Sequence, residues 1–196
     1  MSTRSRAVLL SAMAAAAALT LSACGNGGTS GGGGNTNFVT GNNGIDTAAQ
    51  GERAAAPDLS GTTIDGKSLD IADYKGKVVV VNVWGSWCGP CREEAQYFAK
   101  VSKAYQDKGV QFVGINTRDT STTPALAFEQ EHGITYPSLY DPTGKLMLRF
   151  KKGTLNPQLI PSTLVIDKDG KVAARALEAL DDTALLKMLK PVLAEK

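Results

Sequence analysis

Runs of apolar residues separated by turn residues divide most of the chain into strands and helices. Residues 78–84 read VVVVNVW, a continuous and largely β-branched run that favours a central strand buried on both faces. Residues 110–116 (VQFVGIN) form a second such run. Between the two, residues 92–108 carry apolar side chains at helical spacing and end at Gly109. The pattern therefore predicts a strand, a helix and a second buried strand.

The flanking segments complete an α/β pattern. Residues 59–69 predict a short hairpin around an Asp-Gly pair, and residues 162–177 predict another around Lys-Asp-Gly. Thr123 followed by Pro124 favours the start of a helix that ends at Gly133. Residues 182–189 predict a last helix, ended or kinked by proline. This order indicates an α/β fold with one antiparallel edge.

The first 24 residues have the layout of a secretory signal. Arg4 and Arg6 precede a nearly continuous apolar stretch of about 15 residues, which is shorter than the roughly 20 needed to span a bilayer. Residues 21–24 read LSAC and resemble the lipobox of bacterial lipoproteins. We expect residues 1–23 to be removed and Cys24 to carry the lipid, with an ordinary signal beside a free cysteine as the alternative.

The segment after Cys24 is rich in glycine and asparagine. It includes four consecutive glycines and has few residues that could pack before Pro57. Such a composition does not offset the entropy lost on ordering, so we expect residues 24–56 to be a flexible tether. The predicted domains are thus the signal, the tether and one folded domain over residues 57–196.

Composition narrows the functional class. The chain has 196 residues, of which 42% are hydrophobic, enough for one domain with its own core. The formal net charge is +2, and Arg4 and Arg6 account for both charges, so the mature chain is formally neutral. With no long basic run, nothing in the charge pattern predicts nucleic acid as a partner.

Two of the three cysteines, Cys88 and Cys91, lie just after the first buried run. Structural zinc usually has four ligands, and only His132 and Cys24 remain as further candidates, so we expect no metal site. A structural disulfide over so short a loop would contribute only about 2 kcal/mol. Between a strand and a helix, however, backbone N–H groups and the helix dipole stabilise a thiolate. The position therefore favours a redox pair.

The two cysteines are expected to have different roles. Cys88, at the start of the helix, should be the exposed nucleophile that forms a mixed disulfide with the substrate. Cys91, one turn further, should be shielded and resolve that intermediate. Gly89 should allow a close backbone turn, and Pro90 suits the first helical turn, where its missing N–H is not needed.

The motifs resemble a known superfamily. The segment VVVVNVWGSWCGPC, with IPSTLVIDKDG starting at residue 160, is similar to thioredoxins. The segment APDLSGTTIDGKSLDIADYKGK, the extra strand and helix at 110–135 and the leader resemble the extracytoplasmic TlpA/ResA-like thiol-disulfide oxidoreductases. The resemblance implies a thioredoxin-like fold, with a mixed central sheet flanked by helices, an N-terminal hairpin and an inserted strand-helix segment.

The resemblance also implies site residues. Pro161 would be a cis-proline facing the cysteine pair, and the Ile160–Pro161 loop would pair with the substrate backbone. Trp87 would shape the rim of the active site. Thioredoxins carry a buried aspartate where this chain has Asn82.

In the ResA-like branch an acidic residue matches Glu94, three positions after the second cysteine. We expect Glu94 to tune the thiol pKa and to exchange a proton with Cys91. The alternative is a solvated acid in the first helical turn, favoured there by the helix dipole. Gln96 stands where the family often has proline.

These features predict a lipid-anchored, extracytoplasmic thiol-disulfide oxidoreductase of the bacterial cell membrane. Its substrate would be a cysteine pair in a protein, and no diffusible cofactor would be needed. The family resemblance implies reduction of apocytochrome c cysteines, supplied by a membrane electron donor, and we expect a monomer. The opposite direction, oxidation of secreted proteins, remains open. A copper chaperone is disfavoured by the two-residue spacer and by His132 being the only histidine. A lipoprotein scaffold would not require the paired thiols.

Overall fold

The computed structural model describes residues 36–41 and 43–195. The predicted signal, Cys24 and the glycine run lie outside these residues. Within them, no helix is both long enough and apolar enough to cross a membrane.

A seven-stranded mixed sheet forms the centre of the structure. Its strand order is β1-β2-β9-β8-β5-β6-β7, with β5, β6 and β7 parallel to one another and the remaining neighbours antiparallel. The strands are β1 (Val39–Thr40), β2 (Ile45–Thr47), β5 (Val78–Trp84), β6 (Val110–Thr117), β7 (Ser138–Asp141), β8 (Ser162–Ile166) and β9 (Val172–Ala176). This mixed α/β arrangement is the predicted thioredoxin-like fold.

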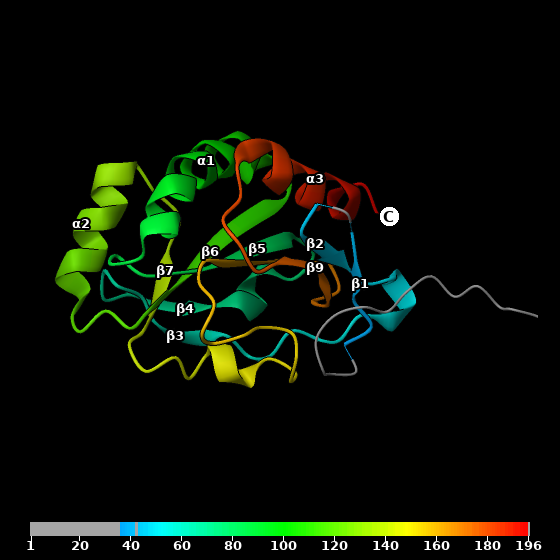
Figure 1. Cartoon of the computed structure of the whole chain (residues 1–196), viewed down its shortest axis with the longest axis horizontal. Helices are drawn as coiled ribbons and strands as arrows, with labels where there is room; N and C mark the ends of the chain where they lie inside the picture. Colours follow the sequence, from blue (N-terminus) through cyan, green and yellow to red (C-terminus); the bar gives the residue numbers. More distant parts are fainter. Residues whose placement is uncertain (1–35, 42, 196) are drawn as a thin grey trace, which may run out of the picture.

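Different elements cover the two faces of the sheet. The helices α1 (Gly89–Tyr105), α2 (Thr122–His132) and α3 (Asp182–Leu193) lie on one face (Figure 1). On the other face lie the predicted hairpin, β3 (Ser60–Thr62) and β4 (Ser68–Asp70), and the segment around the short helix η4 (Met147–Arg149). Three further 3₁₀ helices are η1 (Gln50–Glu52), η2 (Ile71–Tyr74) and η3 (Gln106–Lys108).

The alternation of side chains along β5 explains why its run is continuously apolar. Val80 and Trp84 pack in the cluster under the helices, whereas Val81 and Val83 pack in the cluster on the opposite face. Every residue of β5 is buried. Because side chains alternate, Asn82 occupies a helix-facing position, and its amide is directed toward α1.

The buried strands at 78–84 and 110–116 are confirmed, and three helix boundaries differ from prediction. Helix α1 begins at Gly89 instead of residue 92, because Cys88 provides its N-cap. Helix α2 begins at Thr122, and its N-cap is Ser121, two residues before the predicted cap, Thr123. Helix α3 continues through Pro191, which lies in its last turn, so that the hydrogen bond lost with the missing N–H affects only the end of the helix.

The predicted tether is wrong over its described part. Strand β2 pairs with β9, and Ile45 and Ala48 are buried. The side chain of Arg53 is only 5% exposed and contacts Asp167 at 2.8 Å and Glu195 at 2.6 Å. The folded unit therefore includes residues before Pro57. Strands of two or three residues leave almost no periodic signal, which is why composition misplaced this boundary.

The ion pairs of Arg53 provide a test of this boundary. Replacing Arg53 with alanine leaves the nearly buried Asp167 without its cation, so we expect the free energy of unfolding to fall by about 3 kcal/mol. Urea denaturation of the two proteins measures this change. Lys67→Ala, which removes an exposed ion pair with Asp65, is the control and should change stability little. Equal stability of the Arg53 variant and the parent would show that residues before Pro57 do not belong to the folded unit.

Candidate active site

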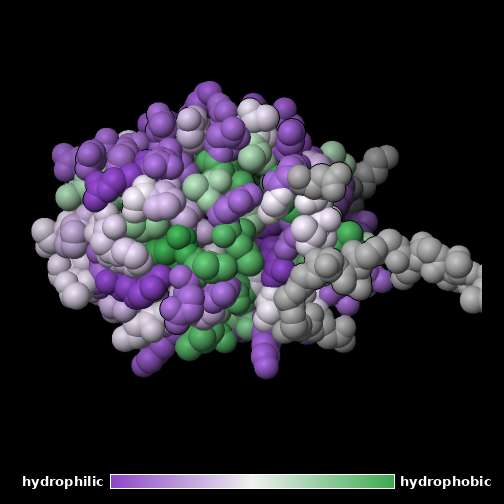
Figure 2. Space-filling view, viewed as in Figure 1, coloured by the Kyte–Doolittle hydropathy of each residue, from purple (hydrophilic) through white to green (hydrophobic). Residues whose placement is uncertain are grey.

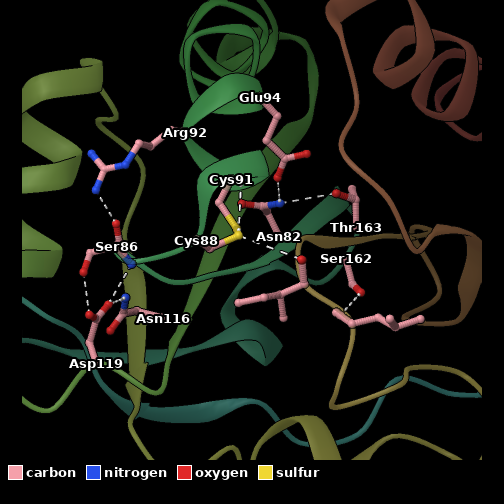
Figure 3. Close-up of a disulfide and its surroundings, with 12 residues drawn as sticks. Asn82, Ser86, Cys88, Cys91, Arg92, Glu94, Asn116, Asp119, Ser162 and Thr163 are labelled. Carbon is pink, nitrogen blue, oxygen red and sulfur yellow. Dashed lines mark hydrogen bonds between the residues drawn. A yellow bond between two sulfur atoms is a disulfide. The ribbon is translucent and has the colours of Figure 1, made fainter.

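A disulfide joins Cys88 and Cys91 where β5 leads into α1 (Figure 3). The two Cα atoms are 5.3 Å apart. Cys88 is the N-cap of the helix, and its Sγ accepts the backbone N–H of Cys91 at 3.2 Å. The first-turn N–H and the positive end of the helix dipole thus meet at this sulfur. Both favour the thiolate once the disulfide is opened.

The expected difference in exposure between the cysteines is absent from this disulfide form. Cys88 is 4% exposed and Cys91 is 2% exposed. The Cys88 Sγ lies 3.8 Å from the carbonyl oxygen of Ile160, so the neighbouring loop covers it. The asymmetry between the two sulfurs is one of position: the sulfur at the helix cap accepts the N–H of the other residue.

Gly89 and Pro90 occupy the first turn of α1 and are exposed. A Cβ added to Gly89 would have no atom within 4 Å, so the expected close turn is not present there. Gly85, four residues earlier, is a position in this segment where a side chain would not fit. A Cβ there would lie 2.7 Å from Nε1 of Trp87, whose indole folds back over it.

The loop before β8 lies against the disulfide. The Ile160–Pro161 peptide bond is cis. Because β8 is the antiparallel neighbour of β5, the start of β8 comes close to the end of β5, where the cysteines lie. The loop is held by Ser162, whose hydroxyl donates to the carbonyl of Leu159 at 2.8 Å. The structure therefore brings together the predicted cysteine pair and the predicted proline loop.

Glu94 is buried beneath the cysteines. Its residue is 2% exposed, which contradicts the alternative of a solvated acid. One carboxyl oxygen accepts the amide of Asn82 at 2.8 Å, and the other accepts the backbone N–H of Leu180 at 3.0 Å. Asn82 also donates to the hydroxyl of Thr163 at 3.3 Å. The amide therefore connects α1 with the strand that follows the cis-proline.

Burial determines the protonation of Glu94. Loss of solvent raises its pKa to about 8, although the hydrogen bonds from Leu180 and Asn82 act in the opposite direction. Near neutral pH this carboxyl can therefore hold a proton and also release it. Cys91 lies three residues earlier on α1, so the two side chains share a face of the helix.

A second polar group lies on the other side of the disulfide (Figure 3). The buried carboxylate of Asp119 accepts the backbone N–H of Ser86 at 3.0 Å and its hydroxyl at 2.5 Å. Asn116 donates to the same carboxylate at 2.6 Å, and Arg92 donates to the carbonyl of Ser86 at 2.6 Å. These contacts fix Ser86, two residues before Cys88.

The sequence analysis missed this group, although a signal was available. Asn116 is the register partner of Trp84 in the parallel pair of β5 and β6. The residues that follow the two strands must therefore meet at one edge of the sheet. An aspartate just after the second apolar run could have been placed beside the residues before Cys88.

A family comparison agrees with this geometry. The Redoxin family model matches residues 49–190. The chain belongs to the Redoxin family. The match begins before Pro57, in agreement with the position of the folded unit in the structure.

Two individual relatives indicate which activity this chain has within the family. ResA from Bacillus anthracis, a thiol-disulfide oxidoreductase, is 32% identical over 122 residues, which cover 62% of this chain and 67% of the relative. ResA from Geobacillus kaustophilus is 31% identical over 137 residues, covering 70% and 72%. This member of the Redoxin family is thus a ResA-like thiol-disulfide oxidoreductase of the thioredoxin superfamily.

Solved structures show the same fold. A DsbF homologue from Corynebacterium diphtheriae is 36% identical, with a TM-score of 0.71, and the match covers 78% of this chain and 96% of the homologue. A secreted thiol-disulfide isomerase from Corynebacterium glutamicum is 30% identical, with a TM-score of 0.73, covering 83% and 100%.

Of the further residues considered for metal binding, His132 lies in the described part of the chain and Cys24 lies outside it. Within residues 36–41 and 43–195, no three His, Cys, Asp or Glu side chains are grouped as a metal site requires. His132 is in the last turn of α2, next to Gly133, and its ring packs against Phe128 at 4.5 Å.

Burial of Glu94 predicts how the stability of this Redoxin-family protein depends on pH. The folded-state pKa of about 8 lies above the ordinary value of 4.5, so the unfolded chain releases the proton first. This contribution to stability is fully present below about pH 4.5 and is lost as pH rises toward 8, by about 1.4 kcal/mol per unit. In the disulfide form, Glu94→Gln should remove this slope. Urea denaturation at several pH values measures it.

A control variant and a second buried acid make the assignment specific. Glu93→Gln changes an exposed neighbour and should leave the slope unchanged. Burial raises the pKa of Glu129 to about 7, so its contribution has the same sign and should persist in the Glu94 variant. A Glu94→Gln protein with the parental slope throughout would contradict the assignment.

Proposed function

We propose that this thiol-disulfide oxidoreductase acts outside the cytoplasm as a reductant of protein disulfides, and that its substrate is the cysteine pair of apocytochrome c. The observation that carries the proposal is a redox-competent pair at the mouth of α1, beside a cis-proline and above a buried, protonatable Glu94. In its ionised form, the Glu94 carboxylate opposes the accumulation of thiolate at the pair. A less stabilised reduced form gives electrons away more readily.

The exchange follows from the positions of the two sulfurs. In the reduced protein, the Cys88 thiolate attacks one sulfur of the substrate disulfide. A mixed disulfide forms, and the other substrate sulfur leaves as a thiolate that takes up a proton. Cys91 then loses its proton and attacks Cys88, which closes the Cys88–Cys91 disulfide and releases the second substrate thiol. Two electrons pass from the pair to the substrate.

We assign to Glu94 the exchange of the proton that Cys91 must lose. The second step requires deprotonation of a sulfur that is 2% exposed, so bulk water has little access. A carboxyl with a pKa of about 8 on the same face of α1 can exchange that proton near neutral pH.

The surface around the pair suits a flexible polypeptide. Figure 2 shows hydrophobic side chains gathered in the middle of one face, flanked by hydrophilic ones. Trp87, next to the nucleophile, is 51% exposed, and Leu159, next to the cis-proline loop, is 45% exposed. Apolar side chains at such positions can bind the residues that flank a substrate cysteine, while the Ile160–Pro161 loop pairs with the backbone.

The location and partners belong to the same proposal. Residues 1–23 would direct export, and a lipid on Cys24 would hold the domain at the bacterial membrane. A membrane electron donor would restore the two thiols after each turnover. No diffusible cofactor is needed, because the electrons reside in the cysteine pair, and we expect the protein to act as a monomer without binding nucleic acid.

The resemblance to a secreted thiol-disulfide isomerase supports a second candidate of the same chemistry. In that case the disulfide would be passed to secreted proteins as they fold. The reduction potential separates the two directions, since an oxidant needs a strongly stabilised reduced form.

Trapping experiments test the assigned roles of the cysteines. Cys91→Ser retains the nucleophile but cannot resolve the intermediate, so the reduced variant should accumulate a mixed disulfide with a peptide whose two cysteines form a disulfide. Cys88→Ser should form none and should lose exchange activity. Mass spectrometry of the reaction without reducing agent detects the adduct. If Cys88→Ser formed the adduct and Cys91→Ser did not, the roles would be reversed; if neither variant nor parent reacted, the proposed function would be wrong.

A further inference from the structure

Arg118 adopts an unusual backbone conformation beside the active site. It directly follows β6 and has a φ of 59°, in the left-handed region that non-glycine residues rarely adopt. Its side chain is exposed. Such a conformation persists only where the surrounding structure imposes it, and it often occurs at functional sites.

Neighbouring hydrogen bonds impose this conformation. Asp119, the next residue, is 4% exposed and binds Ser86 through both carboxylate oxygens. Asn116, two residues before Arg118, donates to the same carboxylate at 2.6 Å, and the hydroxyl of Tyr140 donates to the Asp119 carbonyl at 3.1 Å. The backbone on both sides of Arg118 is therefore fixed to the segment that carries Cys88.

The fixed backbone places the Arg118 guanidinium over the indole of Trp87. The Arg118 Cζ lies 4.7 Å from the ring, and the ring itself lies over Gly85. Trp87 is half exposed and is the immediate neighbour of Cys88. The charge of Arg118 is thereby held at the rim of the site, next to the nucleophile.

Arg118 differs in its contacts from Arg92, which also lies near the site. Arg92 donates to the carbonyl of Ser86 at 2.6 Å and lies 3.8 Å from a carboxylate oxygen of Glu131. Within the described part of the chain, Arg118 makes no ion pair, and its guanidinium stacks on the Trp87 ring. A guanidinium stacked on an indole still presents its N–H donors at the edge of its plane, where a carboxylate can bind.

Acidic side chains gather where α1 faces the segment that leads into α3. Glu93, Glu178 and Asp181 line a hollow beside Glu94, between α1 and the start of α3. A negatively charged side chain would be repelled on that side and attracted on the Trp87 side. The charges therefore define a preferred direction for a bound substrate.

We propose that Arg118, held over Trp87, is a specificity-determining residue that selects substrates with an acidic side chain beside the reactive cysteine. The indole contributes an apolar surface to the same flanking residue, and the guanidinium pairs with its carboxylate. This inference rests on the proposed function, since it concerns the substrate of that site.

Matched peptides test this selectivity. Two synthetic peptides with the same intramolecular disulfide would differ only in having glutamate or lysine next to one cysteine. We expect the reduced full-length protein to reduce the glutamate peptide about two to five times faster at low salt, the range for a solvent-exposed ion pair. The preference should shrink as salt is added, because exposed charges are screened.

Variants separate recognition from structure. Arg118→Gln should bring the two rates together, Arg118→Glu should reverse the preference, and Arg118→Lys should retain part of it. All three keep a side chain at the strained position, so a purely structural effect would change both rates in proportion. Lys108→Gln is the control, because it removes another exposed cation, 4.7 Å above the Tyr105 ring, at the far end of α1. That variant should keep the parental preference.

The outcomes distinguish this inference from the function on which it rests. If the parent reduced both peptides at equal rates, or if Arg118→Gln kept the parental ratio, the role of Arg118 would be wrong while the reductase activity stood. If the parent reduced neither peptide, the proposed function would be wrong, and the inference would be lost with it.

Discussion

The burial of β5 on both faces is the constraint on which the active site depends. The strand is enclosed by the helices on one side and by the β3–β4 hairpin and the η4 segment on the other. This packing fixes the position of its C-terminal end. Cys88 therefore lies at the start of α1, where its sulfur accepts the backbone N–H of Cys91. The same strand directs Asn82 toward Glu94. A core strand thus positions both the cysteine that we propose as the nucleophile and the carboxyl that we propose for proton exchange.

The buried carboxyl of Glu94 lowers stability at neutral pH, and its hydrogen bonds to Asn82 and Leu180 only partly compensate. A buried acid without a functional use would be costly to retain. In the mechanism that we propose it has a use, because each turnover requires a proton to leave and rejoin a shielded cysteine. On this account, part of the folding free energy is given up for proton exchange at the redox pair.

Sequence patterns predicted the elements whose residues are buried in long runs. The seven residues of β5 and the eight of β6 leave a strong apolar signal, and the cysteine spacing identified the chemistry. Strands β1, β2 and β7 contain two, three and four residues, too few for a periodic signal, and they were missed. The contact between Asp119 and Ser86 joins residues 33 apart and depends on the parallel register of two strands. The low exposure of Cys88 depends on a loop 72 residues away.

The equilibrium reduction potential of the Cys88–Cys91 pair tests the central claim most directly. It would be measured by titration against a glutathione or dithiothreitol couple, on a soluble form beginning at residue 36 so that β1 and β2 are retained. A protein that reduces disulfides should have a potential near that of thioredoxin, about −270 mV. A potential near that of DsbA, about −120 mV, would contradict the account and identify the protein as an oxidant.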